Sequence, residues 1–169
     1  MRFKLFMVLM LLLSWSSLAV ASGPTFDLGT VYGMPGQQVT IPVTLTNNGA
    51  SISALSIDIG FDATQLSVPM NAENTAPLAA TRGDAITVSD ETGTQIKNIA
   101  QSIPSPGILR LGVLGNNTIP IGDGVIANIR FNVLASASGT LVLTNNPGAT
   151  SPAAVDVPIT GTHGLLQLP

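Results

Sequence analysis

The sequence predicts an all-β protein built as a sandwich or a barrel, and three observations lead to that prediction. Thr, Val, Ile, Gly, Asn and Pro dominate, whereas Lys and Glu, which usually fill exposed helix faces, are scarce. Apolar and polar residues alternate with a period of two in several segments, which is typical of strands with one buried face. The 12 prolines and 17 glycines interrupt the chain at short intervals, which leaves no room for long helices.

The first 21 residues have the pattern of an export signal. A basic start of Met1-Arg2-Phe3-Lys4 precedes an apolar run over residues 5–20, and Ala19-Val20-Ala21 supplies the small residues that signal peptidase recognises. The alternative is a transmembrane anchor, but the run is shorter than the roughly 20 apolar residues that a bilayer core requires, and serines dilute it. We therefore expect cleavage of residues 1–21, a single domain over residues 22–169, and a secreted protein in the extracellular space or the periplasm.

The charge of the expected mature chain excludes some partners. Removal of the signal leaves four basic residues against nine acids, and those four are Arg82, Lys97, Arg110 and Arg130. Such a surface has no basic patch, so nucleic acid and anionic membranes are poor candidates as partners. The chain has no cysteine, which excludes disulfides and thiolate metal sites.

The first half of the expected domain contains three predicted strands. Residues 26–32 form a short first strand, and the turn Met34-Pro35-Gly36 leads into the alternating segment 38–46. Pro42 lies within that segment and cannot donate a ladder hydrogen bond, so the strand is expected at a sheet edge or with a bulge there. Residues 52–61 alternate again, with four residues pointing inward: Leu55, Ile57, Ile59 and Phe61.

The second half adds further predicted strands after an irregular stretch. Residues 70–95 have few strong apolar positions, although Ile86 and Val88 suggest one short strand. Strands are then expected over residues 96–103, 108–114, 125–133, 139–144 and 164–168. In the strand over residues 125–133 the alternation places five residues on one side: Val125, Ala127, Ile129, Phe131 and Val133. The total of about eight or nine strands is typical of a β-sandwich or barrel.

Three segments, taken together, resemble a cohesin domain. They are Gly36-Gln37-Gln38-Val39-Thr40-Ile41-Pro42-Val43-Thr44-Leu45, the segment from Ile52 through Phe61-Asp62 to Leu66, and Gly122-Asp123-Gly124-Val125-Ile126-Ala127-Asn128-Ile129-Arg130-Phe131-Asn132-Val133. The resemblance runs from Phe26 to Leu168. It implies a nine-stranded β-sandwich with jelly-roll topology, and a non-catalytic module that binds dockerin modules on enzymes, in a setting of polysaccharide degradation.

The resemblance also implies a binding face on the outer side of one sheet. The corresponding outward residues are Ala54, Ser56, Asp58, Gln101, Arg110, Gly112 and Leu114, and the neighbourhood of Gln101 includes Ala100. Among them only Arg110 is of a type that often dominates binding energy. A flat face that simply meets solvent is the alternative interpretation.

Two other binding roles stay open at this point. Related sandwiches bind glycans on exposed aromatic rings, but the expected mature chain contains only four aromatic residues: Phe26, Tyr32, Phe61 and Phe131. Alternation buries Phe61 and Phe131, so a flat platform for a polysaccharide is disfavoured, while loop amides leave carbohydrate binding possible. A structural role in extracellular adhesion is the other alternative.

The residue patterns do not favour an enzyme or a resident cofactor. The single histidine, His163, lies beside Gly164 in a predicted turn, and the adjacent Asp90 and Glu91 would be solvated in a loop. No nucleophile triad, phosphate loop or histidine cluster is present. The loop acids Asp84, Asp90, Glu91 and Asp123 lack the spacing of a calcium site. Asn116-Asn117-Thr118 matches a glycosylation acceptor and is interpreted as part of a loop.

Overall fold

The structure consists of two β-sheets, and the first of them has six strands. The computed structural model describes residues 22–87, 92, 97–116 and 118–169. The strands of this sheet are β1 (Thr25–Leu28), β3 (Gln38–Thr46), β5 (Leu66–Ser67), β6 (Ala80–Arg82), β9 (Gly124–Val133) and β12 (Thr160–Thr162). Their order is β12-β1-β3-β9-β5, and β6 also pairs with β9. A 3-10 turn, η1 (Asp84–Ile86), follows β6.

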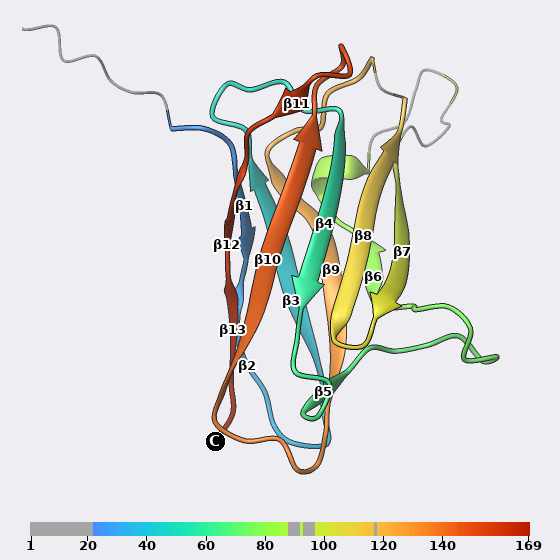
Figure 1. The fold of residues 1–169 in the computed structure, drawn as a ribbon, viewed down its shortest axis with the longest axis vertical. Coiled ribbons are helices and arrows are strands. Elements are labelled where there is room, and N and C mark those ends of the chain that lie inside the picture. Colours follow the sequence, from blue (N-terminus) through green and yellow to red (C-terminus); the bar gives the residue numbers. More distant parts are fainter. Residues whose placement is uncertain (1–21, 88–91, 93–96, 117) are drawn as a thin grey trace, which may run out of the picture.

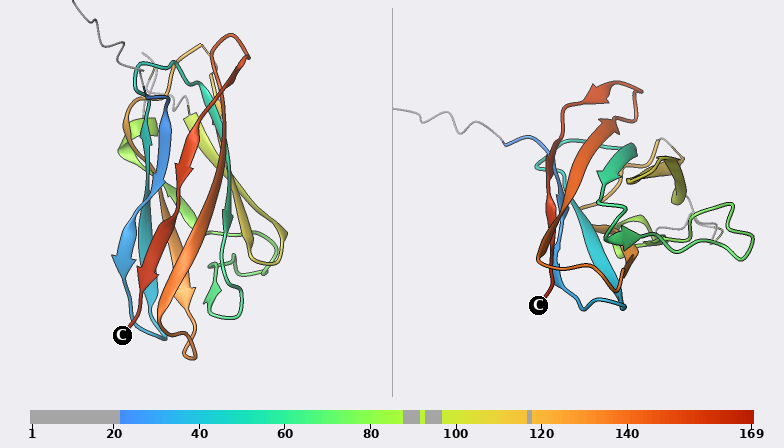
Figure 2. Two further views of the ribbon diagram at one scale, coloured as in Figure 1. Left: turned by 60° about the vertical axis from the view of Figure 1, so that its left-hand side comes forward. Right: turned by 60° about the horizontal axis from the view of Figure 1, so that its bottom comes forward.

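The second sheet packs face to face against the first. Its strands are β2 (Thr30–Tyr32), β4 (Ala54–Gly60), β7 (Lys97–Ser105), β8 (Ile108–Gly115), β10 (Thr140–Thr150), β11 (Asp156–Val157) and β13 (Gly164–Gln167). Their order is β2-β13-β10-β4-β8-β7, with β11 paired to β10. Figure 1 looks onto this sheet, with β3 and β9 behind it, and the views in Figure 2 show the two layers from other sides. The predicted all-β sandwich is therefore confirmed.

The alternation predicted for the long strands is also confirmed, because the space between the sheets is filled by their inward side chains. Along β3 and β4 these side chains are buried: Val39, Ile41, Val43, Leu45, Leu55, Ile57 and Ile59. Phe61 packs on Phe131 at the same level of the core, with ring centroids 5.2 Å apart and an interplanar angle of 62°. This edge-to-face arrangement is the one that aromatic pairs prefer.

The first predicted strand, over residues 26–32, is divided between the two sheets. β1 pairs with β3 in the first sheet, whereas β2 runs parallel to β13 in the second. The division falls at Gly29, whose N–H donates to the carbonyl oxygen of Pro42 at 3.0 Å. A Cβ at Gly29 would lie 3.0 Å from the Pro42 ring, so a larger residue at this close crossing would require the ring to shift by a few tenths of an ångström.

A bulge between β3 and β9 gives the side chain of Val125 a direction that differs from the prediction. The pairing shifts between Val43, which faces Ala127, and Thr44, which faces Val125, so Ile126 is the extra residue. Ile126 is buried, and Val125 is only half-buried on the other side of the break. The inward assignment of Val125 was wrong because a bulge shifts the alternation by one residue.

Pro42 lies beside this bulge, in a strand that is not at a sheet edge. β3 is flanked by β1 and β9, which excludes the edge position that the sequence left open. The bulge that was the other option lies one residue beyond Pro42. No ladder bond is required from Pro42 on the β1 side, because β1 ends at Leu28 and Pro42 accepts from Gly29 there.

The stretch between β5 and β7 also differs from the prediction. Ile86 is buried at the end of η1 rather than in a strand, and Val88 lies outside the described residues. β6 was not predicted, because its three residues show too short a pattern. Between β5 and β6 the chain makes a loop that projects from the sandwich (Figures 1 and 2). Among the described residues, no helix is long and apolar enough to cross a membrane.

Candidate partner-binding face

The outer face of β10, β4, β8 and β7 carries a row of small residues. Gly148 pairs with Ser56, Ser56 pairs with Gly112, and Gly112 pairs with Ala100, so the four residues form one line across four strands. We call this line the small row. No side chain in it is larger than serine, so the backbone of the sheet is open to close approach by another molecule.

Leu114 stands beside the small row and separates two hollows. Its side chain is 54% exposed, which is high for a leucine within a strand. One hollow, of about 310 Å³, is bounded by Ser56, Ala100, Gly112 and Leu114. The other hollow, of about 630 Å³, reaches from Leu114 to residues 156–159. These residues come after β10 in the chain and line the hollow on that side. The face is therefore not flat, because it contains two hollows that both border Leu114.

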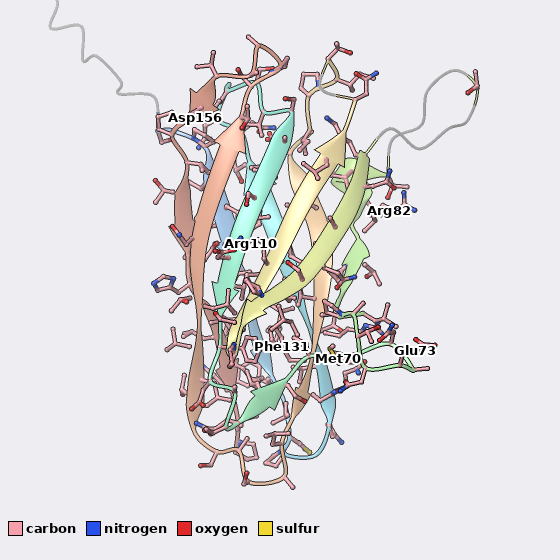
Figure 3. All side chains as sticks on the ribbon, turned by 45° about the vertical axis from the view of Figure 1, so that its right-hand side comes forward. Met70, Glu73, Arg82, Arg110, Phe131 and Asp156 are labelled. Carbon is pink, nitrogen blue, oxygen red and sulfur yellow. The ribbon has the colours of Figure 1, made fainter. Side chains whose placement is uncertain are left out.

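An ion pair lies next to the small row on β4 and β8. The Nε of Arg110 donates to Oδ1 of Asp58 at 2.6 Å, and its Nη2 donates to Oδ2 at 2.7 Å. These hydrogen bonds hold the pKa of Asp58 below its usual value and raise the pKa of Arg110. Because the two charges are already paired, the centre of the face presents no net charge (Figure 3 labels Arg110).

Six of the seven residues predicted for this face lie on its outer side. They are Ala54, Ser56, Asp58, Arg110, Gly112 and Leu114, which lie on the neighbouring strands β4 and β8. Gln101 is the exception, because it pairs with the inward Leu111. Its side-chain oxygen accepts the N–H of Ala80 in β6 at 2.9 Å, so Gln101 connects the two sheets.

The face also contains residues outside that set of seven. On β7 the outward residues include Ala100, which the sequence indicated beside Gln101, and Ser102, in register with Gly112 and Arg110. Asn98 is a further exposed residue of β7 and pairs with Leu114. Asn146 and Gly148 come from the second half of β10, which was predicted to end at residue 144. The polar Asn145 at an inward position and Pro147 hide the alternation there. The sequence offers only the apolar residues Leu143 and Ala149, both buried in the structure, as a sign that the strand continues.

Lys97 holds three strands of the face together from inside the sandwich. Its ammonium donates to the carbonyl oxygens of Ser53 at 2.6 Å and Asn116 at 2.7 Å. Ser53 directly precedes β4 and Asn116 directly follows β8, while Lys97 is the first residue of β7. Burial lowers the pKa of this lysine, because its charged form loses hydration that two carbonyl groups replace only in part.

The residues considered for catalysis or metal binding do not come together in the described parts of the chain. The Nδ1 of His163 accepts the backbone N–H of Asn145 at 3.1 Å, so this ring completes strand hydrogen bonding. Oδ1 of Asp123 accepts the N–H of Asn47 at 2.6 Å, and Asp84 begins η1. Within residues 22–87, 92, 97–116 and 118–169, no three His, Cys, Asp or Glu residues form a metal-binding group.

Two candidate acids and part of one motif lie outside this description. Asp90 and Glu91 are not among the described residues, and neither is Asn117, the middle residue of the glycosylation pattern. Oδ1 of Asn116 accepts hydrogen bonds from the N–H and the hydroxyl of Thr118, as expected of a loop.

Comparison with known proteins gives matches to one family and one fold. A family model described as the cohesin domain matches residues 24–164. A search of curated proteins found no match. The sixth cohesin of scaffoldin B from Acetivibrio cellulolyticus, solved in complex with a Cel5 dockerin variant, has a TM-score of 0.69 and 24% identity. That alignment covers 88% of this chain and 100% of the other.

Two further solved structures are similar at lower identity. The cohesin of the Coh-OlpA–Doc918 complex from Clostridium thermocellum has a TM-score of 0.66 and 14% identity over 88% of this chain and 100% of that one. A non-cellulosomal cohesin from the archaeon Archaeoglobus fulgidus has a TM-score of 0.66 and 13% identity over 88% and 92%. At these identities the solved structures establish the shared fold.

Proposed function

Because the chain belongs to the cohesin domain family, we propose that it is a non-catalytic module that binds a dockerin-bearing protein through the outer face of β10, β4, β8 and β7. The observation that carries this proposal is the small row, which leaves the sheet accessible across four strands. The solved cohesins from A. cellulolyticus and C. thermocellum are complexes with dockerins, which supports a partner of this class.

The chemistry of the face indicates how such a partner binds. The ion pair of Asp58 and Arg110 is satisfied within the domain, and no aromatic residue is among the outward residues of the four strands. Binding therefore depends on close apolar approach over the small row and around Leu114, with hydrogen bonds at the margins, rather than on an aromatic anchor.

The proposed setting is assembly outside the cytoplasm. Residues 1–21 act as a cleaved export signal, and the dockerin partner is an exported enzyme that acts on polysaccharides. One relative was solved with a Cel5 dockerin, which supports this setting. N-terminal sequencing of the protein recovered from the host is expected to begin at Ser22, and recovery of a chain that still contains residues 5–20 contradicts export with cleavage.

The test of the binding face is steric obstruction. Ser56→Trp and Gly112→Trp each place an indole on the small row, where it faces solvent in the free protein and overlaps a docked partner. A Cβ at Gly112 meets only side-chain atoms at 3.7 Å or more, so the domain has room for the change. We expect both variants to keep the parent melting temperature and to lose capture of exported host proteins that carry a dockerin module.

The matched control is Thr40→Trp, an equally large change at an exposed strand residue of the opposite sheet. This variant is expected to capture the same proteins as the parent. If Ser56→Trp and Gly112→Trp also capture them, the partner binds elsewhere and the proposed face is wrong.

A further inference from the structure

Tyr32 is an aromatic residue that the fold leaves in solvent. Its side chain is 79% exposed, the largest value among the exposed large apolar residues of the described chain. The other aromatic rings of the domain face the core: Phe26 and Phe131 are fully buried, and Phe61 packs on Phe131. Folding therefore keeps one aromatic ring available on the outside, and such rings are enriched at binding sites.

The ring is held in place by the strand that carries it. β2 pairs in parallel with β13, so Tyr32 lies in register with Gln167, and the N–H of the next residue, Gly33, donates to the Gln167 carbonyl at 3.0 Å. A Cβ at Gly33 would lie 2.6 Å from Val39, so glycine lets this end of β2 sit directly on the core. A ligand that stacks on Tyr32 therefore meets a backbone that is already ordered.

Tyr32 belongs to one of two neighbouring rows of side chains on the outer face of β2, β13 and β10. The register places Tyr32, Gln167 and Thr140 in one row. The neighbouring row contains Thr30, Leu165 and Val142. We call these six residues the edge patch. A hollow of about 380 Å³ opens beside it, between Tyr32, Met34, Gln167 and Leu168.

The composition of the edge patch restricts the chemistry of its ligand. Its apolar groups are the ring of Tyr32 and the side chains of Leu165 and Val142, and Val142 is 50% exposed. Its polar groups are one phenol, one amide and two hydroxyls, none of which is charged. A matching ligand has an apolar surface bordered by hydroxyl groups and carries no charge, and a pyranose ring has both features.

We propose that the edge patch is a binding site for one sugar ring of a neutral polysaccharide. The ring stacks its C–H face on Tyr32, and Gln167, with both a donor and an acceptor, bonds its hydroxyls. A single aromatic residue supports one ring and not a flat array, so we expect weak binding to chains rather than adsorption to a crystalline surface. This inference goes beyond dockerin binding and does not depend on it.

The edge patch and the small row occupy different ends of β10. Val142 and Gly148 are six residues apart, which corresponds to about 20 Å along an extended strand. Both sites can therefore be filled in one molecule, and each can be removed without the other.

The experiment is native affinity electrophoresis of the domain in gels that contain hydroxyethyl cellulose, mixed-linkage β-glucan, arabinoxylan or galactomannan. We expect at least one of these neutral polymers to slow the parent protein. Tyr32→Ala is expected to bind about tenfold more weakly, as for the loss of one aromatic contact, while Tyr32→Trp keeps the interaction. Gln167→Ala is expected to weaken it to a smaller extent.

Two controls separate this site from other causes of slower migration. Val155→Ala removes another highly exposed apolar side chain, in the loop between β10 and β11, and is expected to migrate like the parent. Ser56→Trp obstructs the small row and is also expected to keep the glycan interaction, so failure of the dockerin proposal leaves this one intact. Absence of retardation by all four polymers, or equal retardation of Tyr32→Ala and the parent, overturns the proposal. A Tyr32-dependent dimer in sedimentation also overturns it, because the patch is then covered by a second copy.

Discussion

Lys97 is a charged residue in a position that is usually apolar. Only 1% of its surface is exposed, and among the described residues its acceptors are two uncharged carbonyl oxygens. Burial of an ammonium removes its hydration, and this cost is the reason that its pKa falls. A neutral amine can still donate to both carbonyls, so deprotonation relieves the cost without loss of the two hydrogen bonds.

The lowered pKa of Lys97 predicts a rise in stability at alkaline pH. Between the folded-state pKa and the ordinary value of 10.5, the unfolded chain binds a proton that the folded chain does not, so the free energy of unfolding increases with pH. Each pH unit within that window raises the free energy of unfolding by at most about 1.4 kcal/mol. Lys97→Met, which keeps the volume and removes the titrating group, is expected to lack the increase.

Urea denaturation of the parent and of Lys97→Met between pH 7 and pH 10.5 measures this difference. The other titrating groups are common to both proteins, so they cancel in the comparison. Parallel pH profiles for the two proteins would show that the lysine is hydrated as well in the folded state as in the unfolded one.

At the scale of elements, the junction of β6, η1 and β9 depends on a glycine. The N–H of Gly83 donates to the carbonyl of Ile126, the extra residue of the β9 bulge, at 3.0 Å. This bond brings the chain so close to β9 that a Cβ at Gly83 would lie 2.2 Å from the carbonyl oxygen of Val125. The φ of Gly83 is −94°, which any residue adopts, so only the lack of space requires glycine here.

Gly83→Ala is therefore expected to destabilise the domain by about 1–3 kcal/mol, the usual cost of overpacking, because backbone rather than a flexible side chain must move. Gly122→Ala is the matched control, since nothing lies within 4 Å of a Cβ at Gly122. That variant is expected to change the free energy of unfolding by less than about 0.5 kcal/mol. Chemical denaturation measures both, and equal effects would mean that the junction accommodates the methyl group.

For the whole molecule, the two sheets share one core. The buried apolar residues of both sheets form a single cluster that includes Ile41 of β3 and Ile57 of β4. Where β1 is followed by β2 and β12 by β13, the chain passes from one sheet to the other after a single residue, which ties the sheets together at one edge. Neither sheet can therefore lose its packing while the other keeps its own.

This shared core predicts one cooperative unfolding transition for residues 22–169. Ile41→Ala and Ile57→Ala remove similar volumes from opposite sheets, and each is expected to cost about 2–5 kcal/mol and to lower the same single melting temperature. Calorimetry distinguishes this from separate unfolding of the sheets, in which each variant would shift one of two transitions and leave the other unchanged.

The architecture was determined by features of the sequence that are local. A period-two pattern such as Val39, Ile41, Val43 and Leu45 indicates a strand and its buried face without knowledge of any neighbour, because successive side chains of a strand point to opposite sides. The same reasoning placed Ser56 and Asp58 on the outside of β4, whereas the resemblance to cohesins indicated which strands share the candidate face.

Only the tertiary structure decided the features that depend on which segments meet. The bulge at Ile126, the inward direction of Gln101, the division of the first strand at Gly29 and the burial of Lys97 each follow from contacts between residues far apart in the sequence. No local pattern records these contacts, because the acceptors of Lys97 are backbone carbonyls that every residue possesses. The small row shows the same dependence: glycine, serine and alanine are unremarkable within their own strands, and become an accessible face only when the register aligns them across four.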